Sequence, residues 1–437
     1  VWGMTQAASE LVRSLHHLGV QFNVTDDDEL DLRNFGGQKK KRTAFAQSDT
    51  GKQLMTALID AVRREESAGT VERFPHHKFR TLLLSGNICG GCTVQDTYTG
   101  ELLRFVCDAV LIATGGLHGL FGDTTGSLAN TGEVTAELFR LGVPMANLEM
   151  IQYHPTTVEL GEKRMLLSEA ARGEGGRLFA LRNGKPWYFM EEKYPELGNL
   201  MPRDITAREV WTVSRDYEVF LDMTELPKEV MEHKLAGLVD DCQTYLHKDI
   251  RKEPIPILPG IHYFMGGIQV DERHRTSMRN LYAAGECCAQ YHGANRLGGN
   301  SLLGAIYGGQ IAAETACRET VSSPNMPCAE ESLLPELSPD AQMQMNRILL
   351  NALGVVRDAQ TLEAGIQEIR KLSGTLPLLG CAMLESALAR KESRGAHWRA
   401  DYPQHNDAVY CKTTVAHWNG QHIAISFESI PERRHDL

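Results

Sequence analysis

The feature that most constrains the fold is a pair of short apolar stretches that each run into a glycine turn. Residues 110–113 read Val-Leu-Ile-Ala and lead into Thr-Gly-Gly at 114–116. Residues 280–286 repeat this pattern as Asn-Leu-Tyr-Ala-Ala-Gly-Glu. A short, wholly apolar run bounded by turn residues is typical of a strand buried on both faces, as in a parallel sheet. The chain is therefore expected to fold in the α/β class, with glycine turns at the C-terminal ends of buried strands.

Length and composition exclude several classes of protein. At about 100–200 residues per domain, 437 residues predict roughly two to four domains. A hydrophobic content of 42% excludes a disordered chain, and no apolar run approaches the ~18 residues of a membrane span. The net charge of −11 argues against a nucleic-acid partner, because proteins that bind nucleic acids normally have a basic surface. Ten cysteines in a chain of this length are no disulfide scaffold, and a reduced cytosolic compartment fits them best.

Most of the remaining pattern is helical. Helices are expected at 5–19, 131–141 and 301–317, because apolar residues recur there at helical spacing. Residues 322–340 contain four prolines and are interpreted as a linker. Three further segments with helical periodicity follow, which predicts a small helical bundle. Apolar and polar residues alternate in the tail after Pro403, which predicts a short hairpin.

Four segments rich in glycine or proline each carry a cationic side chain, centred on His154, Arg203, His262 and Arg296. Glycines let a ligand approach the backbone closely, and arginine binds carboxylates in a bidentate way. If the four segments converge, they suit a small dianion. The alternative interpretation is that each is a structural residue in a tight loop, and the sequence alone leaves both open.

A fifth segment holds Glu169 and Arg172, which are three residues apart. On a helical turn they share a face and can pair. Such a pair is usually a solvated surface contact, but the flanking glycines and apolar residues favour a less exposed setting.

Two common cofactor signals are missing. No GxGxxG sequence follows a strand, so a complete dinucleotide-binding fingerprint is absent. The CxxC at 89–92 has no second pair and no nearby histidine, so no metal site is expected.

Several ordered motifs together carry a family resemblance. They are FGGQ at 35–38, ATGG at 113–116, QYHPT at 152–156, SEAARGEGG at 168–176, PRD at 202–204, HYFMGG at 262–267, GE at 285–286, HGANRLGGNSLL at 292–303 and RKESRGAH at 390–397. In this order they resemble the flavoprotein subunit of succinate dehydrogenase and fumarate reductase, which is related to L-aspartate oxidase. The resemblance runs from about Leu11 to Tyr402. The amino-acid sequence at 34–45, 185–199 and 305–309 is most similar to that of the Bacillus-type succinate:menaquinone branch.

The resemblance implies a Rossmann-like FAD-binding domain, interrupted by an α+β capping domain and followed by a C-terminal helical bundle. The implied boundaries are 1–146 for the first part of the FAD-binding domain, 147–262 for the capping domain, 263–321 for the return to the FAD-binding domain, 322–402 for the bundle and 403–437 for the tail. The family opens with a strand, GxGxxG and a helix, and its respiratory members then carry a histidine that bonds to the flavin. None of these is matched, so we expect an N-terminally incomplete version of such a subunit, with an incomplete FAD-binding domain.

The resemblance also implies a function, the FAD-dependent interconversion of succinate and fumarate by hydride transfer at flavin N5. Arg203 matches the residue that exchanges the proton, and Glu169 and Arg172 match its relay partners. The implied substrate-binding residues are His154, Ser168, His262, Arg296 and Phe35. The implied FAD contacts are Thr114, Gly115, Gly116, Glu133, Glu286, Ser301 and Leu302. Two of these depart from the family, which has Thr at the position of Ser168 and often Asp at that of Glu133.

Further expectations concern partners and alternatives. The resemblance implies an iron–sulfur subunit and a cytochrome b-type membrane-anchor subunit, which would hold the chain at the cytoplasmic inner face of the cell membrane in a respiratory complex. One alternative is L-aspartate oxidase, which uses the same pocket for an amino-dicarboxylate. Another is a fragment that is inactive because it lacks the FAD pyrophosphate loop.

Overall fold

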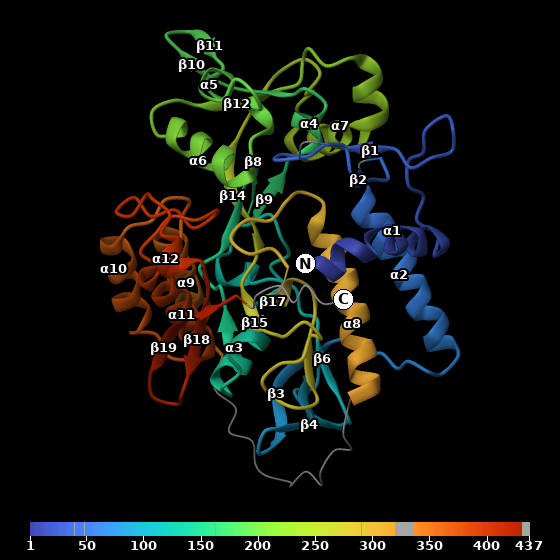
Figure 1. The fold of residues 1–437 in the computed structure, drawn as a ribbon, viewed down its shortest axis with the longest axis vertical. Coiled ribbons are helices and arrows are strands. Elements are labelled where there is room, and N and C mark those ends of the chain that lie inside the picture. The colour runs from blue at the N-terminus through green and yellow to red at the C-terminus, as the bar shows by residue number, and fades with distance from the viewer. Residues whose placement is uncertain (39, 48, 162, 290, 320–335, 431–437) are drawn as a thin grey trace. The chain divides into compact units, whose positions relative to one another are not determined.

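The structure is a computed structural model, and it describes the chain except for residues 39, 48, 162, 290, 320–335 and 431–437 (Figure 1). The chain forms two compact units, each built from three segments. Unit 1 comprises Val1–Pro75, Tyr153–Gly260 and Leu297–Tyr307; unit 2 comprises His76–Gln152, Ile261–Arg296 and Gly308–Leu437. The division into five domain segments stays a prediction.

The elements that lie in or begin within unit 1 are α1 (Trp2–His17), β1 (Leu32–Arg33), β2 (Thr43–Ala44), α2 (Thr50–Ser67), β9 (Lys163–Leu166), α4 (Ala170–Gly173), β10 (Arg177–Arg182), β11 (Lys185–Trp187), α5 (Phe189–Lys193), η2 (Gly198–Leu200), α6 (Arg203–Ser214), β12 (Val219–Asp222), η3 (Val230–Lys234), α7 (Ala236–Asp241), η4 (Cys242–Leu246), β13 (Ile255–Pro256), β14 (Leu258–Phe264) and α8 (Asn300–Glu319). The strand β8 (Ile151–Leu160) enters unit 1 from unit 2.

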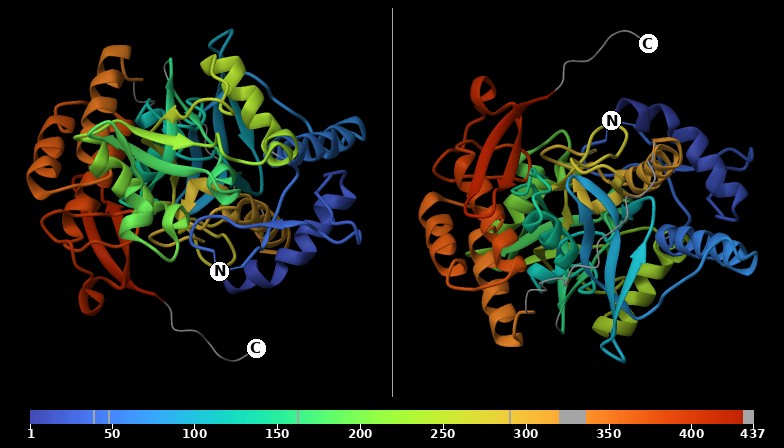
Figure 2. Two further views of the ribbon diagram at one scale, coloured as in Figure 1. Left: turned by 90° about the horizontal axis from the view of Figure 1, so that it is seen from above. Right: turned by 90° about the horizontal axis from the view of Figure 1, so that it is seen from below.

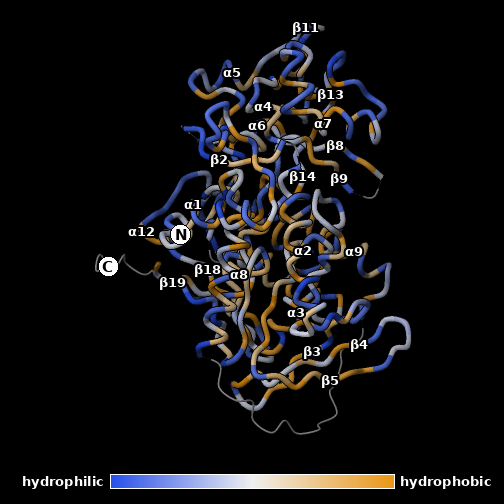
Figure 3. Tube along the Cα trace, turned by 90° about the vertical axis from the view of Figure 1, so that its right-hand side faces the viewer, coloured by the Kyte–Doolittle hydropathy of each residue, from blue (hydrophilic) through white to orange (hydrophobic). Residues whose placement is uncertain are grey.

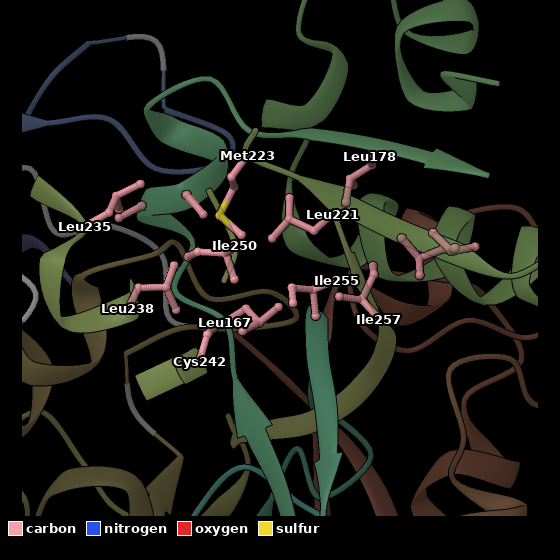
Figure 4. Packing of buried hydrophobic residues seen from close by; sticks show 14 of the residues in the cluster. Leu167, Leu178, Leu221, Met223, Leu235, Leu238, Cys242, Ile250, Ile255 and Ile257 are labelled. Atoms are coloured by element: carbon pink, nitrogen blue, oxygen red, sulfur yellow. The ribbon is translucent and has the colours of Figure 1, made fainter. Parts of the chain in front are cut away.

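The largest core of unit 1 lies between a four-stranded antiparallel sheet and short helices. The strand order is β11-β10-β12-β13. Its inward side chains include Leu178 on β10, Leu221 on β12 and Ile255 on β13, which pack with Leu238 of α7 (Figure 4). Fully buried and partly buried residues alternate along β12, which is the pattern of a strand with one face in this core.

The N-terminal helices of unit 1 form a smaller core. The helix predicted at 5–19 is α1, and its apolar face buries Leu11 and Leu15. Leu15 packs in one cluster with Phe22 and with Leu54 and Ala57 of α2. The helix predicted from apolar periodicity at 5–19 is therefore confirmed.

The elements of unit 2 are β3 (His77–Ser85), β4 (Ile88–Asp96), β5 (Leu102–Val106), β6 (Val110–Ile112), η1 (His118–Leu120), α3 (Glu133–Arg140), β7 (Met145–Ala146), β15 (Gly267–Gln269), β16 (Leu281–Ala283), η5 (Gly285–Cys287), β17 (Cys288–Ala289), α9 (Pro339–Ala352), α10 (Ala359–Ile369), α11 (Thr375–Ala389), α12 (Asp407–Tyr410), β18 (Lys412–Trp418) and β19 (Ile423–Ser429), together with the ends of β8, β14 and α8.

The two apolar stretches that predict buried strands pair with each other. β6 and β16 run parallel, with Val110 opposite Leu281 and Ile112 opposite Ala283. Both strands therefore end at the same edge, and each is followed by its glycine turn. A separate antiparallel sheet has the order β3-β4-β5, and the change from hydrophilic to leucine-rich sequence along β3 can be followed in Figure 3.

The C-terminal part of unit 2 matches the predicted bundle and hairpin. α9, α10 and α11 supply the bundle, and β18 and β19 form the hairpin, which can be followed by their orange and red colour in Figure 2. The hairpin is the edge of a sheet with the order β17-β15-β7-β18-β19. α9 starts where Ser338 accepts the N–H of Ala341 and proline occupies the first turn, an arrangement that favours helix initiation. The predicted linker at 322–340 lies largely outside the described residues.

A buried cluster of charged side chains lies in this C-terminal part of unit 2 and connects it to Glu149. The guanidinium of Arg390 donates to Glu149 Oε1 at 2.7 Å, to Glu392 Oε1 at 2.9 Å and to Thr414 Oγ1 at 2.6 Å. The side chains of Arg390, Glu149 and Glu392 are at most 1% exposed. Removing the cation would leave two buried carboxylates without their shared partner.

We expect Arg390→Met to lower the free energy of unfolding by about 3–5 kcal/mol, since breaking a buried ion pair leaves uncompensated charge in the interior. Urea unfolding followed by circular dichroism measures the change. Lys371→Met is the control, because Lys371 pairs with Glu368 on the surface and its loss is expected to cost less than about 1 kcal/mol. Equal effects of the two substitutions would contradict the importance of the buried cluster.

Among the described residues, no helix combines the length and the apolar character needed to span a bilayer.

Candidate active site

The centre of the candidate site in unit 1 is the carboxylate of Glu169. Arg203 donates to Glu169 Oε2 twice, from Nε at 2.9 Å and from Nη2 at 2.6 Å. Arg172 Nη2 donates to the other oxygen, Oε1, at 3.1 Å, and so does the backbone N–H of Gly36 at 3.1 Å. The side chains are 2% exposed for Glu169, 0% for Arg172 and 7% for Arg203. Three predicted residues, Glu169, Arg172 and Arg203, are therefore in direct contact and away from solvent.

Local structure explains this convergence. Glu169 immediately precedes the single-turn helix α4, and Arg172 lies three residues further along that turn, so the two side chains share a face as predicted. Arg203 is the first residue of α6, directly after the N-cap residue Pro202. Both side chains are buried, which confirms the less exposed setting that the flanking glycines and apolar residues predicted for Glu169 and Arg172.

Burial is the largest influence on the pKa of Glu169 and by itself raises it. The charges of Arg203 and Arg172, with hydrogen bonds from Arg203 and Gly36, outweigh burial and lower the pKa of Glu169 to about 2. Burial lowers the pKa of Arg172, although Glu169 partly opposes this effect. The carboxyl group of Glu169 is therefore ionised at neutral pH.

At two glycines the backbone closely approaches this carboxylate. A Cβ built on Gly36 would lie 2.6 Å from Glu169 Oε1, and a Cβ built on Gly298 would lie 2.5 Å from Glu169 Oε2. Neither position tolerates a side chain without displacing Glu169 or its surroundings. The sequence marked both glycines only as members of motifs; their contact with Glu169 was missed, because it spans more than a hundred residues of chain.

The predicted substrate-binding residues of unit 1 are Phe35, Ser168 and His154, and each has its own local contacts. Phe35 contacts Gly298, since a Cβ there would lie 2.9 Å from Phe35 Cβ. Ser168 Oγ accepts the N–H of Ala170 at 3.2 Å. His154, fully buried on β8, has Nδ1 3.3 Å from the Oγ1 of Thr156.

Ser301 and Leu302, the predicted FAD contacts of unit 1, lie in the first turn of α8, where backbone N–H groups have no acceptor within the helix.

In unit 2, the predicted cofactor residues gather at the C-terminal ends of β6 and β16. Gly115 adopts a positive φ of 72°, and a Cβ on Gly116 would lie 2.6 Å from Glu286 Oε1. The same oxygen accepts the N–H of Phe264 at 3.0 Å. Adjacent parallel strand ends with closely approaching glycine backbone are where α/β folds bind cofactors, so this edge fits an FAD.

Glu133 stands apart from this edge in its contacts. It begins α3 and pairs with Lys78 of β3 at 2.9 Å. Nothing in the sequence pattern indicated Lys78, because the pairing depends on how β3 packs against α3.

Unit 2 also holds two of the predicted cationic groups. His262 Nδ1 lies 2.8 Å from Thr125 Oγ1. The guanidinium carbon of Arg296 lies 4.2 Å from the ring centroid of Tyr263, and this side chain is buried. Burial, aided by the charge of Arg296, lowers the pKa of the neighbouring His292 to about 3, so His292 is neutral.

Over the described part of the chain, no group of three or more His, Cys, Asp or Glu side chains is arranged to hold a metal ion.

Comparison with known proteins gives consistent matches. Residues 3–302 match the model of an FAD binding domain, and residues 373–434 match that of the fumarate reductase flavoprotein C-term. The chain is 36% identical to the succinate dehydrogenase flavoprotein subunit of Bacillus subtilis (98% of this chain, 82% of that protein) and 33% identical to the fumarate reductase flavoprotein subunit of Mycobacterium tuberculosis (95% and 81%). A structure of Escherichia coli quinol fumarate reductase superposes with a TM-score of 0.86 at 25% identity, covering 98% of this chain and 83% of that one.

We expect Gly298→Ala to lower the free energy of unfolding by about 1–3 kcal/mol, because the added methyl group overlaps Glu169 Oε2 and Phe35. The control is Gly51→Ala on α2, where a Cβ meets nothing within 4 Å; it should be neutral or slightly stabilising. Chemical unfolding of both variants measures the difference, and a neutral Gly298→Ala would contradict the close packing on Glu169.

Proposed function

The chain belongs to the family of succinate dehydrogenase and fumarate reductase flavoprotein subunits, and on that premise we propose that it interconverts succinate and fumarate with Arg203 as the proton donor and acceptor. It is an FAD-dependent oxidoreductase of this family. The observation that carries the proposal is the buried contact of Arg203 with Glu169 at 2.6 Å.

An arginine is an unusual acid, since its pKa normally lies above ~12. It can serve only if its proton is replaced at once. Glu169 touches Arg203 through one oxygen and Arg172 through the other, so a single carboxylate connects the two guanidinium groups. This contact supports Arg203 as the group that exchanges a proton with the substrate carbon, with Glu169 and Arg172 restoring its protonation.

When bound, FAD supplies hydride acceptor and donor chemistry at its N5 atom. The residues proposed to hold it are Thr114, Gly115, Gly116, Glu286, Ser301 and Leu302, with Glu133 as a further contact. Support comes from the parallel strand ends of β6 and β16, which present backbone to a ligand in the way a cofactor edge requires.

The two carboxylates of the substrate are assigned to His154, Ser168, His262 and Arg296, with Phe35 packing on the carbon chain. The cationic and hydroxyl groups suit a dianion, because arginine can bind a carboxylate with two parallel hydrogen bonds. The burial of Arg296 supports this role, since charge-assisted hydrogen bonds are stronger where water is excluded.

We further propose that the chain works in a respiratory complex with an iron–sulfur subunit and a cytochrome b-type anchor, on the cytoplasmic face of the membrane. The relatives named as flavoprotein subunits support an assembly of several chains.

The direct test is fumarate reduction by the FAD-loaded protein with a reduced dye. We expect Arg203→Ala to lower kcat by about 10²- to 10⁴-fold, the usual contribution of a general acid. Arg215→Ala is the matched control, because Arg215 is exposed at the other end of α6; its kcat should equal that of the wild type. An Arg203→Ala protein that keeps most of its activity would show that another group transfers the proton.

The same FAD-loaded protein can be used to test L-aspartate as the alternative substrate. Succinate oxidation is expected to exceed L-aspartate oxidation in kcat/KM, in accord with the matches to succinate and fumarate enzymes. The reverse order would identify an L-aspartate oxidase. A purified chain without stoichiometric flavin absorbance after FAD loading would instead favour the inactive fragment.

A further inference from the structure

Gln38 is a buried polar residue to which the reaction scheme gives no role. Gln38 is 8% exposed and is the last residue of the glycine-containing loop at 35–38. Its Oε1 accepts the N–H of Phe35 at 3.1 Å, and its Nε2 donates to the carbonyl oxygen of Gly298 at 3.1 Å and to Thr43 Oγ1 at 3.2 Å. One amide therefore fastens a loop to a segment 260 residues away.

The two backbone segments that Gln38 joins are those that contact the Glu169 carboxylate. Gly36 donates its N–H to Oε1, and Gly298 packs against Oε2, the oxygen that receives both hydrogen bonds from Arg203. Phe35 and Gly298 also touch each other. The position of Glu169 thus depends on how closely the loop at 35–38 and the turn at Gly298 are held together.

We propose that Gln38 is a positioning residue, which clamps Gly36 and Gly298 on opposite oxygens of Glu169 and so aligns Glu169 with Arg203. This inference rests on the proposed role of Arg203. A displacement of about 1 Å within a catalytic cluster can cost on the order of a hundredfold in rate. Loss of the amide also leaves the buried N–H of Phe35 and carbonyl of Gly298 without this partner, which is costly in a dry site.

Two substitutions separate the two ends of the clamp. Gln38→Met is similar in size but can neither accept from Phe35 nor donate to Gly298. Gln38→Glu keeps the acceptor for Phe35 and donates to Gly298 only while its carboxyl group is protonated. Burial raises the pKa of a carboxyl group, so the introduced acid should titrate within the range accessible to an assay.

The experiment measures fumarate reduction by the FAD-loaded variants from pH 5.5 to 8.5. Gln38→Met should lower kcat at least tenfold at every pH. Gln38→Glu should approach wild-type kcat at the acid end and fall at least tenfold below it at the alkaline end, with KM for fumarate changed less than kcat. Gln53→Met is the control, since Gln53 Oε1 accepts the exposed backbone N–H of Gln21 and forms no hydrogen bond with Phe35, Gly36 or Gly298. Its pH profile should match that of the wild type.

Amide hydrogen exchange of the peptide containing Gly36 gives a second readout that needs no turnover. Faster exchange is expected in Gln38→Met than in the wild type or Gln53→Met. An active wild type, with Gln38→Met and Gln38→Glu indistinguishable from it in kcat and in exchange, would overturn the clamp. An inactive wild type would contradict the proposed function instead, and the exchange rates would still decide whether Gln38 holds the loop.

Discussion

The candidate site of unit 1 depends on one interaction, the burial of the Glu169 carboxylate between Arg203 and Arg172. Taking three charges out of water is costly, and only close pairing and complete hydrogen bonding offset that cost. Here Oε2 receives two hydrogen bonds from Arg203, and Oε1 receives one from Arg172 and one from the backbone of Gly36. The carboxylate is therefore well solvated by the protein itself, which is why it stays ionised although burial opposes ionisation.

This constraint explains the distribution of glycine around the site. Gly36 and Gly298 approach the carboxylate oxygens so closely that no Cβ fits at either position. The dense packing excludes water, and with it the dielectric screening that would weaken the contact between Glu169 and Arg203. Gln38 then acts where two backbone segments need a common anchor. The charge pairing, the hydrogen bonds and the close packing of the glycines all act on the same carboxylate of Glu169.

Much of the local structure followed from the sequence. The apolar stretches at 110–113 and 280–286 predicted buried strands, which are the parallel pair β6 and β16. Helical periodicity located α1, α8 and the bundle, and the buried residues of α1, α9 and α10 recur at helical spacing. Spacing alone also predicted the pairing of Glu169 with Arg172.

The contacts that complete the site could not be predicted in this way. The Gly36 amide reaches Glu169 across 133 residues, and Gln38 reaches Gly298 across 260. Backbone groups carry no signal in side-chain patterns, and a lone glutamine after two glycines is compatible with any polar loop. The pairing of Glu133 with Lys78, and the cluster of Glu149 with Arg390, likewise depend on tertiary packing.

The central claim is that Glu169 is a buried carboxylate kept ionised by its two arginines. Infrared spectroscopy of the wild type against Glu169→Gln tests it directly, because a protonated carboxyl group absorbs at a frequency distinct from that of a carboxylate. The pKa of Glu169 is lowered to about 2. At every pH from 4 to 8, the substitution should therefore remove absorbance of a carboxylate, and the carboxylic acid region of the spectrum should stay unchanged. Loss of a carboxylic acid band near neutral pH would show that Glu169 is protonated and would contradict the account.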